Sequence, residues 1–230
     1  MPFLGRCPIL CLVTDRWSLV TEPRDEDTAG RDLITLIDAA CQADIDLIQI
    51  REQRLSDHAL AELVAKAVDV ARGTPTRIIV NDRLDVALAV GAAGVHLKSH
   101  GVSVSRVRAI VPPRWVIGCS VHGLDDARVA AATGEVDYLT LGTIFETSSK
   151  PGRVPLGLES LGAVIRAVPL PVLAIGGMTV GRAAAVARAG AAGVAAITLF
   201  AHMVGEAGSG TLSDGVRELR LAFDKGRTLV

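Results

Sequence analysis

Aromatic residues are scarce in this chain: Phe, Trp and Tyr make up 3% of its 230 residues, although hydrophobic residues account for 50%. A core of this composition must be built from Val, Ile, Leu and Ala. That favours parallel strands covered on both faces over an all-β sandwich. The length suits one large domain, and we expect a single domain over residues 1–230.

The chain also lacks an excess of charge and a long apolar run. Its formal net charge of −1 provides no general field for nucleic acid or an anionic membrane, so neither is an expected partner. We find no stretch of membrane length, and the apolar run near the N-terminus is too short for a signal peptide. We therefore expect a cytoplasmic protein that binds a small molecule. A homo-oligomer is compatible with this sequence.

Cysteine pairs of the CxxC type are absent. The four cysteines, Cys7, Cys11, Cys41 and Cys119, lie in apolar segments, which is typical of small buried side chains in a reducing compartment. We expect free thiols.

Short β-rich runs alternate with helical patterns along the whole chain. Strands are predicted at 9–14, 44–50, 77–80, 94–97, 115–119, 138–142, 172–175 and 193–198. Helices are predicted at 29–42, 56–71, 84–90, 103–111, 123–133, 158–168, 180–189 and 212–225. This α/β alternation predicts a single (β/α)8 barrel, the TIM-barrel fold, with its active site at the C-terminal ends of the strands. An open doubly wound sheet is the alternative, but no GxGxxG follows the first strand.

Polar residues that follow the predicted strands are the candidate ligand-facing groups. They are Gln49, Arg51, Asn81, Asp82, Lys98, His100, Ser120, His122, Thr147, Ser149, Lys150, Gly176, Gly177 and Thr198. The polar loop at 15–28 is a candidate lid over them.

Each of these candidates also has a structural interpretation. Gly176-Gly177 can be a tight turn, but its place after the seventh strand favours phosphate binding by backbone N–H groups. Asp82 can hold a hard cation or cap the next helix. His122 is a candidate acid or base because imidazole titrates near neutral pH, whereas His96, inside an apolar strand, is predicted to be structural.

Five segments together resemble one family, the thiamine phosphate synthase and thiazole tautomerase superfamily. They read QIRE at 49–52, NDRLDVALAVGAAGVHL at 81–97, IGCSVHGLDDA at 117–127, DYLTLGTIFETSSKPG at 137–152 and PVLAIGGMT at 171–179. In the synthase, the resemblance implies, a pyrimidine diphosphate ionises with the help of magnesium and its carbon is captured by the nitrogen of a thiazole phosphate.

The resemblance implies an intact pocket for thiazole phosphate. Thr147, Ser149 and Lys150 match the T-x-T-K loop, and Gly177, Ile197 and Thr198 match the phosphate cup, with Thr198 where serine is more usual.

The diphosphate side departs from the family. Gln49, Arg51, Asn81 and Asp82 match, but Gln53 stands where a lysine is expected. The G-Q-x-D segment that carries the second magnesium carboxylate reads Lys98-Ser99-His100-Gly101. The loss of this carboxylate and of the lysine removes a metal ligand and a cation from the diphosphate side, which weakens the synthase interpretation, although Lys98 can compensate for part of the metal charge.

SVH at 120–122, FET at 145–147 and GGMT at 176–179 resemble the tautomerase branch. We therefore expect a thiazole tautomerase that aromatises a thiazole carboxylate phosphate, with His122 as proton carrier, Ser120 orienting the substrate and no cofactor. The first alternative is thiamine phosphate synthase, with Mg²⁺ at Asp82. The second is a non-catalytic barrel that binds a thiamine precursor and regulates another process.

Overall fold

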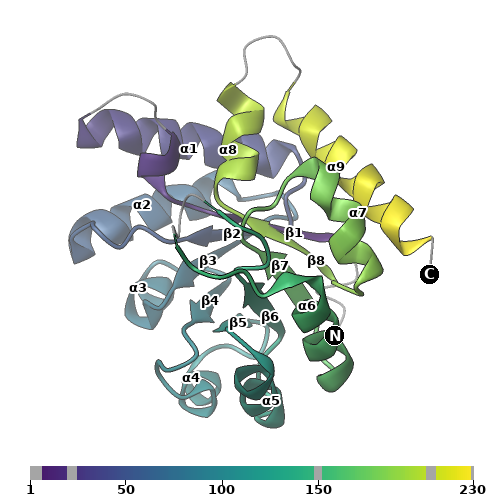
Figure 1. The fold of residues 1–230 in the computed structure, drawn as a ribbon. Coiled ribbons are helices and arrows are strands. Elements are labelled where there is room, and N and C mark those ends of the chain that lie inside the picture. Colours follow the sequence, from purple (N-terminus) through teal and green to yellow (C-terminus); the bar gives the residue numbers. More distant parts are fainter. Residues whose placement is uncertain (1–6, 20–24, 148–151, 206–210, 229–230) are drawn as a thin grey trace.

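The strands close into a parallel barrel. A computed structural model describes residues 7–19, 25–147, 152–205 and 211–228, and its strands pair in the order of the sequence, with β8 returning to β1 (Figure 1). The strands are β1 (Ile9–Val13), β2 (Leu47–Ile50), β3 (Arg77–Asn81), β4 (Gly94–Leu97), β5 (Val116–Val121), β6 (Tyr138–Gly142), β7 (Val172–Ile175) and β8 (Gly193–Ala196). The predicted (β/α)8 barrel is confirmed, and the open sheet is excluded because β1 pairs with β8.

Helices surround the barrel on its outside (Figure 1). They are α1 (Glu26–Gln42), α2 (Asp57–Val70), α3 (Leu84–Ala89), α4 (Val104–Ile110), α5 (Leu124–Ala132), α6 (Gly157–Ala167), α7 (Val180–Arg188), α8 (Thr198–Gly205) and α9 (Leu212–Arg227), with a short 3-10 helix, η2, at Arg16–Leu19. Among the described residues, no helix is long and apolar enough to cross a membrane.

Both faces of the strands are buried, as the aliphatic composition predicts. In β1, Leu10 and Leu12 belong to the layer between strands and helices, while Ile9, Cys11 and Val13 belong to a smaller cluster in the barrel interior. Successive side chains of a strand point to opposite faces. Each strand therefore contributes to both layers, and there is no solvated face to give a polar alternation.

Among the boundaries that differ from the sequence prediction, two have side-chain hydrogen bonds beside them. Helix α1 begins at Glu26 rather than Ala29, since the Asp25 carboxylate accepts a hydrogen bond from the Thr28 backbone N–H at 2.8 Å. Strand β2 begins at Leu47 rather than at residue 44, and Asp46, at a bend just before it, accepts the Leu10 backbone N–H on its carboxylate at 2.8 Å.

The sequence prediction missed α8. It extended the last strand through residue 198, but β8 ends at Ala196 and Thr198 is the first residue of α8. The segment TLFAHMVG is apolar almost throughout, so it carries no polar stripe that would mark a helix. A short extra helix at this place puts its N-terminus at the barrel mouth.

Of the cysteines, Cys11, Cys41 and Cys119 are buried free thiols, as expected. Cys7 is free but exposed, so its predicted burial is wrong. It lies just before β1, where the sheet no longer covers it.

Candidate active site

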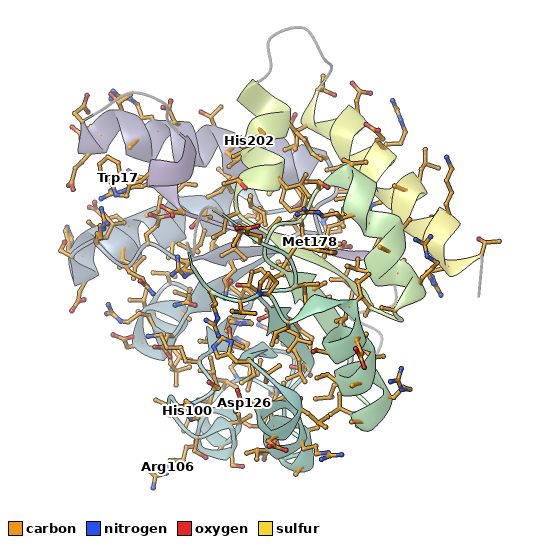
Figure 2. All side chains as sticks on the ribbon, viewed as in Figure 1. Trp17, His100, Arg106, Asp126, Met178 and His202 are labelled. Atoms are coloured by element: carbon orange, nitrogen blue, oxygen red, sulfur yellow. The ribbon has the colours of Figure 1, made fainter. Side chains whose placement is uncertain are left out.

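A pocket of about 250 Å³ opens at the C-terminal ends of the strands. The residues that line it lie in, or shortly after, every strand except β4. They are Val13, Asp15, Gln49, Arg51, Asn81, Ser120, Val121, His122, Thr140, Gly142, Thr143, Thr147, Ile175, Gly176, Gly177, Met178, Ala196, Ile197 and Thr198. Met178, labelled near the middle of Figure 2, is one of the apolar groups of this wall.

Most of the candidate residues predicted from the sequence line the pocket. Each predicted substrate-binding or catalytic residue within the described ranges lines it, from Gln49 in β2 to Thr198 in α8. Ser149 and Lys150 lie outside the described residues. His100 is exposed and lies near α4 (Figure 2), and Asp82 is not part of the lining. The placement is thus known, while the chemical roles stay predictions.

Ser120 is inside β5 rather than beyond its end, because the strand runs to Val121. Beneath it lies the buried His96, whose Nε2 is 2.9 Å from Ser120 Oγ and 3.3 Å from Thr140 Oγ1. On its other side, His96 Nδ1 is 2.9 Å from the Tyr138 hydroxyl. Burial lowers the His96 pKa to about 3, so the imidazole is neutral at physiological pH. The prediction of a structural, hydrogen-bonded His96 is confirmed.

Gly118 makes this His96–Tyr138 pair possible. A Cβ at this position would lie 2.3 Å from Tyr138 Cζ and 2.5 Å from His96 Nδ1, so only glycine leaves room for both rings.

The hydrogen bonds between Tyr138, His96 and Ser120 indicate which nitrogen of the His96 ring carries the proton. Within the described residues, the Tyr138 hydroxyl has His96 Nδ1 as its partner, so donation by the hydroxyl avoids leaving a buried donor unpaired. The neutral imidazole then carries its proton on Nε2 and donates it to Ser120 Oγ. Ser120 keeps its own O–H, which can be donated to a ligand in the pocket.

His122 follows β5 directly and is exposed at the pocket wall. Its Nδ1 lies 3.1 Å from the Gly142 carbonyl oxygen, which can only accept, so Nδ1 carries a proton. The Asp126 carboxylate accepts its backbone N–H at 3.0 Å and fixes the turn into α5. The neutral ring therefore offers an unprotonated Nε2, the form that a general base requires.

The loop after β7 is held in one conformation. Gly177 has a φ of +62°, and a Cβ there would lie 2.3 Å from the Glu146 carbonyl oxygen. Arg182 of α7 donates a hydrogen bond to the Gly177 carbonyl, and its guanidinium carbon lies 4.6 Å from the centroid of the Phe145 ring. Sequence reasoning missed Arg182, since a helical arginine carries no signal that it holds a loop.

The QIRE segment divides its polar groups between two sides of β2. Gln49 faces the pocket and donates to Asn81 Oδ1 at 3.4 Å, and Arg51 lies at the pocket wall. Glu52 is turned away and buried, where it accepts the Arg16 backbone N–H at 3.1 Å. Burial raises the Glu52 pKa. Arg51 is the cationic member of the segment at the pocket.

Sequence reasoning also missed two polar lining groups in and just after β6. Thr140 lies within β6, and Thr143 follows that strand directly. The alternation of β6 places Thr140 on the inner face with Tyr138. Asp15, which the sequence assigned to the lid, lies at the pocket instead. The rest of the predicted lid contains η2, and residues 20–24 are outside the described ranges.

Magnesium, which the resemblance implies for a synthase, does not fit the residues around Asp82. The Asp82 carboxylate is already paired with the Lys98 ammonium, Oδ2 to Nζ, at 2.5 Å. In the described part of the chain, no group of three or more His, Cys, Asp or Glu residues is arranged to hold a metal ion. Mg²⁺ needs several oxygen ligands in octahedral geometry. The described residues around Asp82 therefore form no magnesium site.

The fold and the site define a (β/α)8-barrel protein with a polar, half-enclosed pocket at its strand ends. The family model described as thiamine monophosphate synthase matches residues 17–200. The chain is 38% identical over 199 residues to thiamine-phosphate synthase from Roseiflexus castenholzii, covering 86% of this chain and 83% of that protein. It is 41% identical over 192 residues to the enzyme of the same name from Methanoculleus marisnigri, covering 83% and 88%.

A solved structure supports the same relationship. Thiamine phosphate pyrophosphorylase from Pyrococcus furiosus superimposes with a TM-score of 0.75 at 27% identity, covering 95% of this chain and 96% of that one. The chain therefore belongs to the thiamine monophosphate synthase family, and it is an enzyme of thiamine biosynthesis.

Proposed function

We propose that this protein is a thiamine-phosphate synthase, which joins a pyrimidine diphosphate to a thiazole phosphate and releases diphosphate. The observation that carries this proposal is the likeness, over 86% of the chain, to a protein named thiamine-phosphate synthase. It reverses the order of preference from the sequence, which placed the tautomerase first. The lining of the pocket supports it, because both ends of the pocket offer groups suited to phosphate.

The thiazole phosphate belongs at the β6–β8 end of the pocket. Gly176 and Gly177 follow β7, and Thr198 begins α8 after Ile197. Backbone N–H groups and a hydroxyl at a helix N-terminus bind phosphate oxygens without a side-chain cation. Thr147 reaches the same end from the loop after β6. The thiazole ring nitrogen would then face the centre of the pocket.

The pyrimidine diphosphate belongs at the β2–β3 end. Arg51 offers a planar guanidinium to the diphosphate, while the amides of Gln49 and Asn81 face the pyrimidine. The bond between the pyrimidine methylene carbon and the diphosphate oxygen breaks, and the electron pair leaves with the oxygen. The thiazole nitrogen then forms the new carbon–nitrogen bond. Arg51 stabilises the charge that develops on the leaving group.

A second candidate, thiazole tautomerase, is favoured by one specific observation. The Nδ1 atom of His122 lies 3.1 Å from the Gly142 carbonyl oxygen, so a neutral His122 ring presents its unprotonated Nε2 at the pocket. Such a base can remove a proton from a ring carbon and return it at an exocyclic position, and Ser120 can donate to the substrate carboxylate.

Two parallel NMR assays separate these candidates. One mixture contains the purified protein, pyrimidine diphosphate, thiazole phosphate and either Mg²⁺ or a chelator; the other contains only the non-aromatic thiazole carboxylate phosphate. Formation of thiamine phosphate with release of diphosphate supports the synthase. Isomerisation in the second mixture, without coupling in the first, contradicts it and selects the tautomerase.

His122→Gln adds a second criterion. A proton carrier typically contributes 10²- to 10⁴-fold to the rate, so a tautomerase would lose roughly that factor. Coupling needs no proton transfer by His122 and should change much less. Binding of thiazole phosphate without turnover in either mixture would contradict both enzymes and support a regulatory barrel.

A further inference from the structure

Asp82 has a fixed place at the barrel mouth. It follows β3, its φ is +56°, and its backbone N–H donates to the His96 carbonyl at 2.8 Å. Aspartate is one of the few residues that tolerate this left-handed conformation. Its side chain is therefore aimed by the backbone of two adjacent strands.

One carboxylate oxygen of Asp82 already has a cation. Oδ2 lies 2.5 Å from Lys98 Nζ, and the Lys98 side chain is 59% exposed. Lys98 follows β4, the strand that pairs with β3. An ammonium has three donors on a flexible stem. Lys98 can thus pair with Asp82 and still donate to a phosphate oxygen at the mouth.

The other carboxylate oxygen faces a residue without a side chain. A Cβ on Gly101 would lie 3.2 Å from Asp82 Oδ1, and the Gly101 N–H donates to the Lys98 carbonyl at 3.2 Å in a tight turn. The φ of Gly101 is not in the left-handed region, so an L-residue is sterically possible there. An aspartate at this position would place a second carboxylate beside that of Asp82, as a metal site requires.

We infer that the Lys98 ammonium is the cation that pairs with Asp82 in this protein. Because Gly101 provides no second carboxylate, this single ammonium takes the place of a divalent metal ion. The role of this ammonium toward a diphosphate rests on the proposed synthase function. The pairing itself does not, because it can be tested in the absence of any substrate.

The test is Mn²⁺ binding, followed by electron paramagnetic resonance and by calorimetry, in the absence of substrate. The wild type, Lys98→Ala, Gly101→Asp and the double variant K98A/G101D are compared. Only the double variant places two unpaired carboxylates side by side. It should bind Mn²⁺ at least about tenfold more tightly than the wild type, since a repelling charge is removed and an attracting one added.

A third substitution serves as the control. Asp82→Asn in the K98A/G101D background should abolish that binding. Saturable Mn²⁺ binding by the wild type that disappears in Asp82→Asn would overturn the proposal. So would failure of the double variant to bind while its circular dichroism spectrum and Tm match those of the wild type.

A substrate assay then tests the role of the ammonium. If the wild type forms thiamine phosphate, a chelator should not reduce that rate, and Lys98→Ala should lower kcat/KM. A rate abolished by the chelator would overturn the role of Lys98 toward the diphosphate. If the protein has no synthase activity, the proposed function is contradicted, but the Mn²⁺ experiment still tests the Lys98–Asp82 pair.

Discussion

The two ends of the pocket hold their polar groups by different means. At the β6–β8 end, the groups are backbone N–H donors, glycines and threonines, and Arg182 donates a hydrogen bond to the loop after β7. At the β2–β3 end, the charged group of the lining is the long side chain of Arg51, and the Lys98–Asp82 pair lies outside the lining, after the neighbouring strands β3 and β4. A backbone site depends on the conformation of the chain, whereas a side-chain site depends on individual charges. Substitutions should therefore affect stability at the first end and ligand binding at the second.

Gly177→Val should have the largest effect. It forces a β-branched residue into φ +62° with its Cβ 2.3 Å from the Glu146 carbonyl oxygen. Strain and overpacking together should lower the free energy of unfolding by roughly 3–5 kcal/mol. Urea denaturation measures this. The matched control is Gly30→Ala in α1, where a Cβ meets nothing within 4 Å and helix propensity predicts a gain of about 0.5–1 kcal/mol. Equal stabilities would show that the β7 loop is not constrained.

Arg51→Ala should leave the fold intact and damage function. Loss of one charge-stabilising donor typically reduces the rate by about 10²- to 10³-fold, and we expect kcat/KM for coupling to fall by about that factor. Arg54→Ala is the matched control, because Arg54 is exposed and does not line the pocket. If both variants lose activity equally, general charge rather than the position of Arg51 is responsible.

Because His96 is buried beneath the pocket, we expect the free energy of unfolding to depend on pH. The His96 pKa is about 3 in the folded protein against 6.5 for the free group. The unfolded chain therefore binds a proton at a pH where the folded protein does not, and acid favours unfolding. Between about pH 6 and about pH 4, this histidine should remove about 1.4 kcal/mol of stability for each unit that the pH falls.

The comparison variant is His96→Asn, which has no titrating ring. Its free energy of unfolding, followed in urea across the same pH range, should be less steep than that of the wild type by this amount. Identical slopes would mean that His96 is not buried in its neutral form.

The smallest effect on stability is expected for Lys98→Ala. The Lys98–Asp82 pair is largely exposed on the lysine side, and such pairs contribute about 0–1 kcal/mol. Thermal denaturation should show a Tm within a few degrees of the wild type. A much larger loss would make Lys98 part of the fold and would remove the contrast between the two ends of the pocket.

The barrel and most of the pocket could be predicted from the sequence because of two simple regularities. The period of apolar runs marks strands and helices, and parallel strands in a (β/α)8 barrel bring their C-terminal ends together. The residues that follow each run, such as Arg51, His122 and Gly177, must then meet at one mouth. The choice between synthase and tautomerase followed from no such regularity, because both reactions are compatible with the same pocket.

Contacts between distant residues were not predictable in this way. Thr140 and Arg182 are ordinary members of a strand and a helix by pattern, and only their positions in space connect them with Ser120 and Gly177. Likewise, α8 was missed because an apolar segment shows no periodicity when tertiary packing covers it.

The sequence by itself determined the barrel, its closure order and the groups at its mouth, because these depend on local periodicity and on the chirality of the connections. The tertiary structure alone decided which charged and polar groups are in contact. Lys98 pairs with Asp82, Gly101 has no side chain beside the other Asp82 carboxylate oxygen, and His96 Nε2 lies 2.9 Å from Ser120 Oγ. Such pairings depend on distances of a few ångströms between strands, and neighbours along the chain do not encode them.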